Sequence, residues 1–554
     1  MKQKIKQMIT AAVDSACQQG DLPAAGIPEI MVEAPKADVH GDFSTNAAML
    51  LASSAKKAPR VIAAAILAHM DDSEGILAKT DIAGPGFINF FIKPDAWLPV
   101  LKAVHAAGAM YGAGNIGRGR RIQVEFVSSN PTGPLHVGHG RGAAVGDSVG
   151  NILAFYGFDV QKEYYINDSG RQIHTLGLSV YLRCRALMGE TVAYPDECYQ
   201  GDYIRDIAAD IVRDQNSELQ QRSEASAIEW CARLAAERII KGIREDLTAF
   251  GVTFDRWYSE QSLYDAGKVA AMIDRFTEKG VIYPREGALW FKTAAFGDEK
   301  DRVVVRRNGQ TTYFASDIAY HQEKYERGFD KVIDVWGADH HGYIPRMKAA
   351  VEALGYDRSR FDVILVQLVN LLRGGRPVAM STRAGEFVTL DDVVREVGTD
   401  AARFIFLTRH YESPLDFDLE VAKQKTNDNP VYYVQYVHAR ISSIIRKGGQ
   451  KGITRGADAA ASAVRLTAPE EINLIKQLDR YPETVRLSAE TMEPHRITFY
   501  LMNLASDFHS YYNKHRVLTD DPVLTQGRLY LVSAVRSVIR NGLRLLGVSA
   551  PETM

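Results

Sequence analysis

Two histidines, His136 and His139, lie three positions apart in SSNPTGPLHVGHGR, which runs from Ser128 to Arg141. Imidazole N–H groups donate to phosphate oxygens and stabilise the negative charge that develops there during a reaction. Gly138 lies between them and has no side chain, so a flat base can approach the backbone. The spacing differs from G-x-G-x-x-G and does not predict a dinucleotide site. Ordinary helix-start residues, or a metal-binding pair without a third ligand nearby in the sequence, remain alternatives.

The elements around this stretch predict where the histidines lie. RIQVEFV, from 121 to 127, reads as a strand, the segment after the histidines has helical spacing, and FDVQKEYYI, from 158 to 166, reads as a second strand. A strand, a helix and a strand in about 45 residues predict a βαβ unit of a parallel sheet. The histidines then lie at the carboxyl end of a strand, where open α/β sheets bind ligands and a helix N-terminus favours phosphate.

The first of these strands carries a carboxylate. Ile122, Val124 and Phe126 alternate with Gln123 and Glu125, so we expect one apolar face and one polar face. A carboxylate in such a strand costs free energy unless it is paired. A bound cation is therefore a reasonable partner for Glu125.

The rest of the pattern predicts three parts. Residues 1–112 read as a small α+β domain, 113–390 as a parallel-sheet domain with a helical insertion at 168–285, and 391–554 as wholly helical. The strand patterns KVIDVWG and FDVILVQLV resume after the insertion. We therefore expect an α/β fold with a doubly wound core, an N-terminal α+β domain and a C-terminal all-α bundle.

The composition is that of a globular protein. Of the 554 residues, 46% are hydrophobic and 24% are charged. No stretch approaches the roughly 18 to 20 apolar residues of a membrane span, and four irregularly spaced cysteines indicate a reducing cytoplasm. Val421–Met554 holds 18 basic against 12 acidic side chains, net +6, leaving 48 and 56 elsewhere, net −8. The positive part is a candidate polyanion surface, and chance asymmetry explains it equally well.

The histidine stretch resembles a known signature. PLHVGHGR resembles the H-I-G-H signature of class I aminoacyl-tRNA synthetases, and VEFVSSNPTGPLHVGHGRGAAVGD resembles the arginyl-tRNA synthetases in particular. Further matching motifs follow in order over nearly the whole chain: GDFSTNAAM, YYINDSGRQI, YFASDIAYH, VWGADHHGYIPR, VGTDAARFIFL and NPVYYVQYVHARI. The resemblance implies a class I Rossmann-like catalytic core. It also implies ATP-dependent activation of L-arginine to arginyl-adenylate and its transfer to the 3′ end of tRNA(Arg).

The resemblance assigns roles to individual residues. The implied ATP site consists of Pro134, His136, Gly138, His139 and Asp339. The implied arginine site consists of Glu125, Asn130, Tyr313, Asp317 and His340. Asp317 is the expected partner of the guanidinium, whose fixed fork of donors suits a carboxylate. A plain helix N-cap is the alternative for Asp317. We expect Mg²⁺ to arrive with ATP and no dedicated metal site.

The second class I signature, K-M-S-K-S, is altered. The corresponding loop is RPVAMSTRAGEF, in which Met380 and Ser381 stand but Ala379 and Thr382 occupy the lysine positions. In the family these lysines hold the pyrophosphate. Met380, Ser381 and Arg383 are the candidate catalytic residues of this loop, with Arg376 or Arg383 expected to supply the missing positive charge.

The resemblance also implies tRNA contacts. The N-terminal domain is expected to touch the tRNA elbow through a sheet edge that carries Phe87 and Asn89. The C-terminal bundle is expected to bind the anticodon through Tyr436 and Arg440, an aromatic face and a cation suited to unstacked bases. We expect a monomer in the cytoplasm, with no membrane partner.

Three rival functions remain open from the sequence. A cytidylyltransferase shares the histidine signature but is a short single-domain chain, which leaves the helical third without a role. A synthetase specific for cysteine would need zinc ligands, and one specific for an acidic amino acid would need a basic pocket. A catalytically inactive RNA-binding paralogue is supported only by Ala379 and Thr382 in the second signature.

Overall fold

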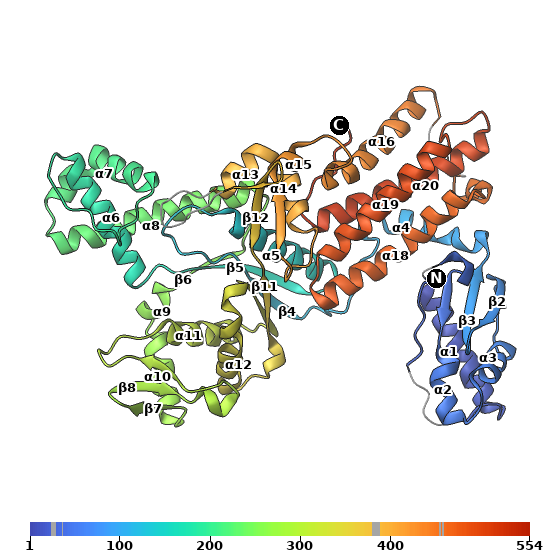
Figure 1. Ribbon diagram of the computed structural model, residues 1–554, viewed down its shortest axis with the longest axis horizontal. Helices are drawn as coiled ribbons and strands as arrows, with labels where there is room; N and C mark the ends of the chain where they lie inside the picture. The colour runs from blue at the N-terminus through green and yellow to red at the C-terminus, as the bar shows by residue number, and fades with distance from the viewer. Residues whose placement is uncertain (24–28, 36, 379–387, 454–455, 457–458) are drawn as a thin grey trace. The chain divides into compact units, whose positions relative to one another are not determined.

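The computed structural model describes residues 1–23, 29–35, 37–378, 388–453, 456 and 459–554. They form two compact units, which are described separately (Figure 1). Unit 1 contains Met1–Tyr111, Ile441–Tyr481 and Ser506–Val538, and unit 2 contains Gly112–Arg440, Pro482–Ala505 and Ile539–Met554. No helix of the described residues is long and apolar enough to cross a membrane.

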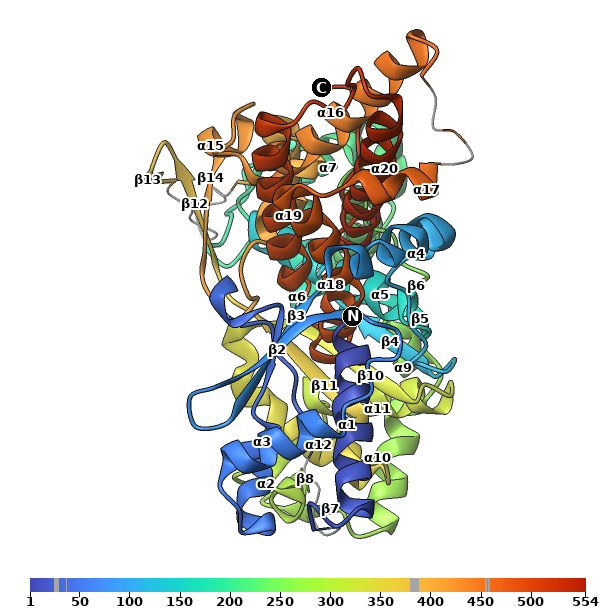
Figure 2. The same cartoon turned by 90° about the vertical axis from the view of Figure 1, so that its right-hand side faces the viewer.

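The N-terminal part of unit 1 is built on an antiparallel sheet in the order β1-β3-β2. GPGFINFFI supplies β3, in which Asn89 is buried and accepts a hydrogen bond from Ser44 Oγ at 2.8 Å. β3 is therefore the central strand, and the prediction that Phe87 and Asn89 lie on a sheet edge is wrong. Figure 2 shows β2 and β3 with α1, α2 and α3. The elements are α1 (Lys2–Gln18), η1 (Asp38–His40), β1 (Phe43–Thr45), α2 (Ala47–Ala55), α3 (Pro59–Ala68), β2 (Leu77–Ala83), β3 (Phe87–Ile92), η2 (Pro94–Trp97), α4 (Pro99–Ala107) and η3 (Gly108–Met110).

The C-terminal region is helical, as the sequence predicts. Its long helices carry residues of both units, and their buried side chains are mainly aliphatic and aromatic. The elements are α16 (Pro430–Gln450), α17 (Ala459–Ser462), η7 (Ala463–Arg465), α18 (Pro469–Thr491), α19 (His495–Lys514) and α20 (Pro522–Leu545).

Unit 2 is organised around a parallel sheet of five strands in the order β11-β10-β4-β5-β6. The strands are β4 (Arg121–Glu125), β5 (Asp159–Ile166), β6 (Arg256–Ser259), β10 (Lys331–Gly337) and β11 (Phe361–Val366). α5 (Val137–Phe155) is the crossover from β4 to β5, as the predicted βαβ unit requires. The parallel sheet and the helical C-terminal region confirm the predicted fold class.

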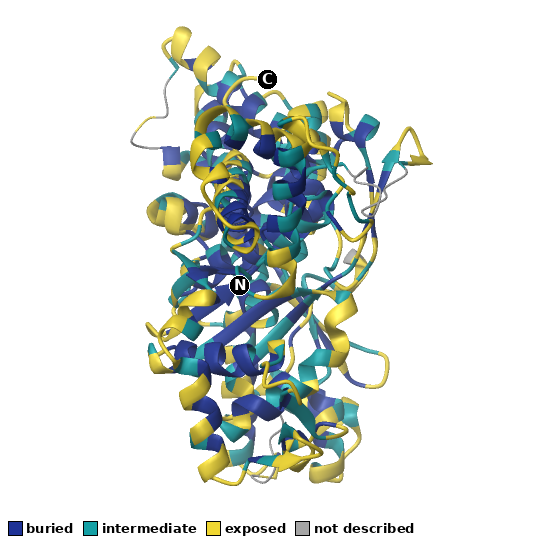
Figure 3. Ribbon diagram, turned by 90° about the vertical axis from the view of Figure 1, so that its left-hand side faces the viewer, coloured by how far each residue is buried: buried dark blue, intermediate teal, exposed yellow. Residues whose placement is uncertain are grey.

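Both faces of β4 are covered. Gln123 is 0% exposed and Glu125 8% exposed, although they were expected on a polar face. Parallel sheets carry helices on both faces, so alternation along a strand does not mark a solvent-facing side. The strands are coloured mostly as buried in Figure 3.

Three short strands lie where the sequence predicted helix. β6 and β7 (Ile282–Arg285) fall within the predicted insertion, and β14 (Leu415–Asp418) lies after residue 391. β6 pairs with β5, β7 with β8 (Ala288–Phe291), and β14 with β12 (Val369–Arg373). Each of the three has four residues, too few to produce a clear alternating pattern. The helices between β5 and β6 are α6 (Arg171–Leu187), α7 (Asp202–Gln220) and α8 (Glu224–Ala249).

The remaining elements of unit 2 come between β6 and β10, between β10 and β11, or after β11 in the chain. β7, β8 and β9 form a separate antiparallel sheet. The elements are α9 (Gln261–Asp265), α10 (Lys268–Glu278), β7 (Ile282–Arg285), β8 (Ala288–Phe291), η4 (Thr293–Phe296), β9 (Arg302–Val305), α11 (Tyr313–Glu326), η5 (Ala338–Tyr343), α12 (Ile344–Ala353), η6 (Arg358–Arg360), β13 (Arg376–Pro377), α13 (Leu390–Val397), α14 (Thr399–Phe406) and α15 (Leu419–Lys423).

Candidate active site

The strand order creates a crevice at the predicted site. β4 pairs with β5 on one side and with β10, much later in the chain, on the other. Crossovers leave β4 and β10 in opposite directions at such a switch point, so their carboxyl ends border an open crevice. The histidine stretch follows β4, and Asp339 and His340 follow β10. The structure thus brings these two predicted segments to the same edge of the sheet.

The two histidines form the first turn of α5 as a capping pair. His136 is the N-cap, its Nδ1 accepts from Gly138 N at 3.1 Å, and His139 Nδ1 accepts from His136 N at 3.2 Å. The rings stack with centroids 3.7 Å apart. Because both Nδ1 atoms are acceptors, the proton of each neutral ring is on Nε2. Each half-buried ring can therefore donate through Nε2.

Burial keeps both rings neutral. It lowers the pKa of His136, and burial together with the His136 ring lowers the pKa of His139 to about 3. A neutral imidazole can donate a hydrogen bond to a phosphate oxygen. Because it carries no charge, it forms no ion pair within the protein when no ligand is bound. The pair is thus suited to bind an anion that gains charge during a reaction.

The absence of a side chain at Gly138 leaves room for the ring of His136. A Cβ at this position would lie 3.0 Å from both Cε1 and Nδ1 of His136. We expect Gly138→Ala to displace that ring by a few tenths of an ångström and to lower kcat by about tenfold, because small misplacements of aligned groups are costly. Steady-state kinetics measure this. Gly142→Ala, in the same helix where a Cβ meets nothing within 4 Å, is the control, and equal activity of the two variants would contradict the expectation.

Glu125 is paired within the protein. Its Oε1 accepts from Ser128 Oγ at 2.9 Å, and its Oε2 accepts from Lys324 Nζ at 2.5 Å. Lys324 is fully buried and also donates to Asp334 Oδ1 at 2.9 Å. Burial raises the pKa of Glu125, and Lys324 opposes that rise. Sequence reasoning missed Lys324, which lies 199 positions away.

Asp317 lies in the first turns of α11 and is not its N-cap. Thr312 occupies the N-cap position, so the helix-cap alternative for Asp317 is wrong. Tyr343 donates its hydroxyl to Asp317 Oδ2 at 2.5 Å, which joins the YFASD and WGADHHGY motifs. Burial raises the pKa of Asp317 to about 6, and the carboxylates of Glu260 and Glu125 also raise it. Such a carboxylate is stabilised by an incoming cation.

Glu260 is a further acidic residue beside Asp317 that sequence reasoning missed. It is 2% exposed, and its two oxygens accept from Ser169 Oγ at 2.8 Å and Ser316 Oγ at 2.7 Å. Hydroxyl donors hold the carboxylate in place without neutralising it. In the sequence, the partner Ser169 in the NDSG motif indicates the position of Glu260 only weakly.

The other predicted residues are placed individually. Asn130 donates to Gln172 Oε1 in α6, and Tyr313, 56% exposed, opens α11. His340 and Asp339 are exposed, with His340 Nε2 3.6 Å from Asp339 Oδ2. Pro134 borders a cavity of about 180 Å³ whose other walls come from α7 and α8. Within the described ranges, no three His, Cys, Asp or Glu side chains are grouped to hold a metal ion.

Residues 379–387, with Ala379, Met380, Ser381, Thr382 and Arg383 of the altered second signature, lie outside the described residues. The chain directly after them is anchored to the histidine stretch. Leu390 N donates to Leu135 O at 2.8 Å, and His136 and Thr389 form an isolated β-bridge. Residues 388–390 therefore lie beside the histidine stretch.

Arg141 of the HVGHGR motif has a structural role that the sequence did not reveal. It is fully buried and donates to the carbonyls of Gln367 at 2.9 Å, Ser413 at 2.8 Å and His410 at 3.1 Å. Burial lowers its pKa to about 10. Arg141 thus ties α5 to the segments that flank β12 and β14.

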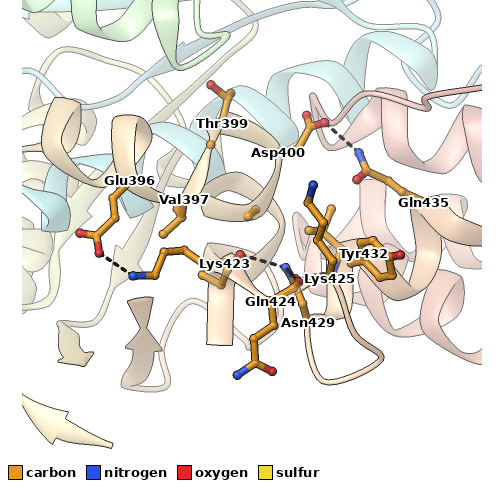
Figure 4. A pocket seen from close by; sticks show the side chains of 14 residues that line it. Glu396, Val397, Thr399, Asp400, Lys423, Gln424, Lys425, Asn429, Tyr432 and Gln435 are labelled. Carbon is orange, nitrogen blue, oxygen red and sulfur yellow. Dashed lines mark hydrogen bonds and ion pairs between the residues drawn. The ribbon is translucent and has the colours of Figure 1, made fainter. Parts of the chain in front are cut away.

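A larger pocket of about 580 Å³ lies away from these residues, between α13, α14, α15 and the start of α16 (Figure 4). Figure 4 shows Glu396 paired with Lys423 and Asp400 bonded to Gln435. None of the predicted site residues lines it. Its acidic groups are already paired, so it offers no obvious partner for a substrate cation.

The predicted anticodon residues lie together on α16. Tyr436 and Arg440 are both half-buried, and the guanidinium carbon of Arg440 is 4.9 Å from the Tyr436 ring centroid. Tyr432 stacks on Tyr436 with centroids 6.0 Å apart. In unit 1, Phe87 is 39% exposed, whereas Asn89 is buried.

Family models match three segments of the chain. Residues 102–410 match "tRNA synthetases class I (R), catalytic domain", residues 2–92 match "Arginyl tRNA synthetase N terminal domain", and residues 434–554 match "DALR anticodon binding domain". The first two descriptions agree with the resemblance that the sequence motifs carry.

Relatives match over the full length. The chain is 62% identical over 556 residues to a protein of Desulfosudis oleivorans, and 53% identical over 555 residues to one of Citrifermentans bemidjiense. Both are named Arginine--tRNA ligase, and both alignments cover 100% of each chain.

Solved structures are also similar. The crystal structure of a putative arginyl-tRNA synthetase from Campylobacter jejuni has a TM-score of 0.77 and 36% identity, covering 84% of this chain and 100% of that one. The Thermus thermophilus arginyl-tRNA synthetase has a TM-score of 0.75 at 24% identity, covers 100% of both chains, and shows the shared fold.

Proposed function

The chain belongs to the arginyl-tRNA synthetases of class I, and from this premise we propose how its residues carry out the reaction. It is an arginine–tRNA ligase that uses ATP. The carboxylate of arginine attacks the α-phosphorus of ATP, diphosphate leaves, and arginyl-adenylate forms. A hydroxyl of the terminal ribose of tRNA(Arg) then attacks the arginyl carbonyl, and AMP leaves.

The histidine pair supports an assignment to ATP. Two neutral imidazoles with Nδ1 fixed as acceptors leave Nε2–H as the donor of each ring. His136 and His139 would donate to phosphate oxygens whose charge grows as diphosphate leaves. Gly138 leaves space for the adenine base, Pro134 and Asp339 border the nucleotide, and Mg²⁺ enters with ATP. Met380, Ser381 and Arg383 would act on the diphosphate.

The acidic residues support an assignment to arginine. Asp317, whose pKa is raised to about 6 by burial, would be stabilised by a guanidinium partner, and we assign Tyr313 and His340 to the same pocket. Glu125 ends β4, Asn130 lies in the segment that follows it, and both would hold the α-ammonium. A carboxylate–guanidinium pair in a buried site is bidentate and directional, which suits selection of arginine over lysine.

The tRNA contacts are proposed from aromatic side chains and from the positive charge of the C-terminal part. Tyr436 and Arg440 offer an aromatic face with an adjacent cation, Phe87 offers an exposed ring, and Asn89 would act only by shaping β3. The net charge of +6 over Val421–Met554 predicts that tRNA binding weakens as salt rises. We propose a monomer that works in the cytoplasm.

ATP–diphosphate exchange tests the proposed function. We expect exchange with arginine and not with lysine or citrulline, and the family resemblance implies that it requires tRNA. The observation that carries the proposal is the neutral histidine pair at the same sheet edge as the carboxylates of Glu125 and Asp317. Exchange with citrulline equal to that with arginine would contradict it, because citrulline lacks the cation.

A further inference from the structure

The segment that joins β4 to α5 is held by side chains that follow it in the sequence. Its residues 126–135, here called the signature loop, form no helix or strand. Tyr164 of β5 donates to Ser129 O at 2.9 Å, and Asn130 donates to Gln172 Oε1 of α6. Val127 has a φ of 68°, which is rare for a β-branched residue and persists only where the surroundings fix the backbone. The conformation of the signature loop therefore depends on contacts from outside it.

One of these contacts comes from the middle of the insertion. Tyr203, in the first turn of α7, donates its hydroxyl to Thr132 O at 2.6 Å, four positions before His136. A Cβ on the neighbouring Gly133 would lie 3.2 Å from the same hydroxyl. Beyond this contact, Pro134 faces the cavity of about 180 Å³ whose other walls come from α7 and α8. The signature loop thus has room to move towards the insertion, and the bond from Tyr203 opposes that movement.

We infer that Tyr203 is a positioning residue for the histidine pair, because its bond to Thr132 O fixes the signature loop from which α5 begins. The insertion then sets the geometry of the ATP site without touching ATP. The inference rests on the proposed assignment of His136 and His139 to ATP. Misplacement of aligned groups by about 1 Å can lower a rate by about 100-fold. A signature loop that shifts towards the cavity should therefore slow adenylate formation more than it weakens substrate binding.

Tyr203→Phe tests this, since it removes the hydroxyl and keeps the ring. We expect kcat of ATP–diphosphate exchange at saturating tRNA to fall by about tenfold, as for a lost hydrogen bond that aligns reacting groups. KM for ATP and for arginine should stay within about twofold of the wild type. Tyr194→Phe is the matched control. The half-buried Tyr194 also donates to a backbone carbonyl, Tyr199 O at 2.5 Å, but that bond lies within the insertion. All its constants should stay within about twofold.

Gly133→Ala tests the same contact from the side of the signature loop. In the wild type its Cβ would crowd the Tyr203 hydroxyl at 3.2 Å, so we expect kcat to fall by about tenfold here as well. In the Tyr203→Phe background the nearest atom is the ring carbon Cζ at 3.4 Å, an ordinary contact. The double variant should therefore have a kcat within about twofold of that of Tyr203→Phe alone, because the two changes act through one contact.

The outcomes separate the inference from the proposed function. If Tyr203→Phe keeps the wild-type kcat, or raises KM alone, the inference is overturned and the proposed function stands. An equal loss in Tyr194→Phe would indicate a general loosening of the insertion and would also overturn it, as would losses that multiply in the double variant. If His139→Asn leaves adenylate formation unchanged, the assignment of the histidine pair to ATP is wrong, whatever Tyr203→Phe does.

Discussion

Asp317→Asn is expected to lower kcat/KM for arginine by about 100- to 1000-fold, mainly through a higher KM for arginine. The asparagine keeps the shape and can still accept from Tyr343, which bonds to Asp317 Oδ2 at 2.5 Å. It loses the charge that would pair with a guanidinium in a place with little water. Truncating one partner of a buried charge pair costs about 2 to 5 kcal/mol. Arginine-dependent kinetics at saturating ATP measure the loss.

The pH dependence of kcat/KM for arginine tests the role of Asp317 independently. Because burial raises the pKa of Asp317 to about 6, its charged form is present above that pH and is lost as pH falls through it. We expect kcat/KM for arginine to decline below a pH of about 6 in the wild type. The decline should be absent from Asp317→Asn, whose side chain does not titrate. Without ligand, the raised pKa means that stability falls as pH rises from the usual value towards 6, and bound arginine should reverse this.

Asp301→Asn is the matched control for both measurements. Asp301 Oδ2 also accepts from a tyrosine hydroxyl, that of Tyr283 at 2.7 Å, but it lies between η4 and β9 rather than beside the proposed site. It should leave kcat/KM within about twofold. A small effect of Asp317→Asn, similar to that of Asp301→Asn, would remove Asp317 from the guanidinium site.

The βαβ unit around the histidines was predictable because its signals are local. β4, α5 and β5 follow directly from strand alternation, helical spacing and a glycine stop within one short segment. The position of the histidines at the carboxyl end of β4 then follows from topology. The neutral state and the Nε2 tautomer of the rings do not, because they depend on backbone donors of the turn itself.

The partners of the acidic residues were not predictable because they are distant in the sequence. The sequence predicted a bound cation as the partner of Glu125, but the cation that the structure provides is Lys324, on α11. Asp334 belongs to the apolar-looking KVIDVWG strand, and nothing in that strand indicates that it lies opposite Glu125. Register between strands from separate parts of the chain is set by the whole sheet.

Substitution of His139 is expected to have the second large effect, on kcat rather than on KM. Its side chain has two functions that different substitutions can separate: Nδ1 accepts from His136 N at 3.2 Å and caps α5, while Nε2 is proposed to donate to phosphate. Asparagine reproduces the acceptor of the cap but has no donor at the Nε2 position. Glutamine reaches the Nε2 position with an amide N–H but loses the cap geometry.

We expect His139→Asn to fold with a Tm close to that of the wild type and to lower kcat of adenylate formation by about 100- to 1000-fold, as for the loss of a donor that acts on developing charge. His139→Gln should lose stability, by about 0.5 to 2 kcal/mol for a missing cap, and yet exceed His139→Asn in kcat. The ATP KM should change less than kcat in both, because the contact strengthens in the transition state. Pre-steady-state adenylate formation and thermal unfolding measure the two quantities. If His139→Asn were fast and His139→Gln slow, the histidine would serve the helix and not the phosphate.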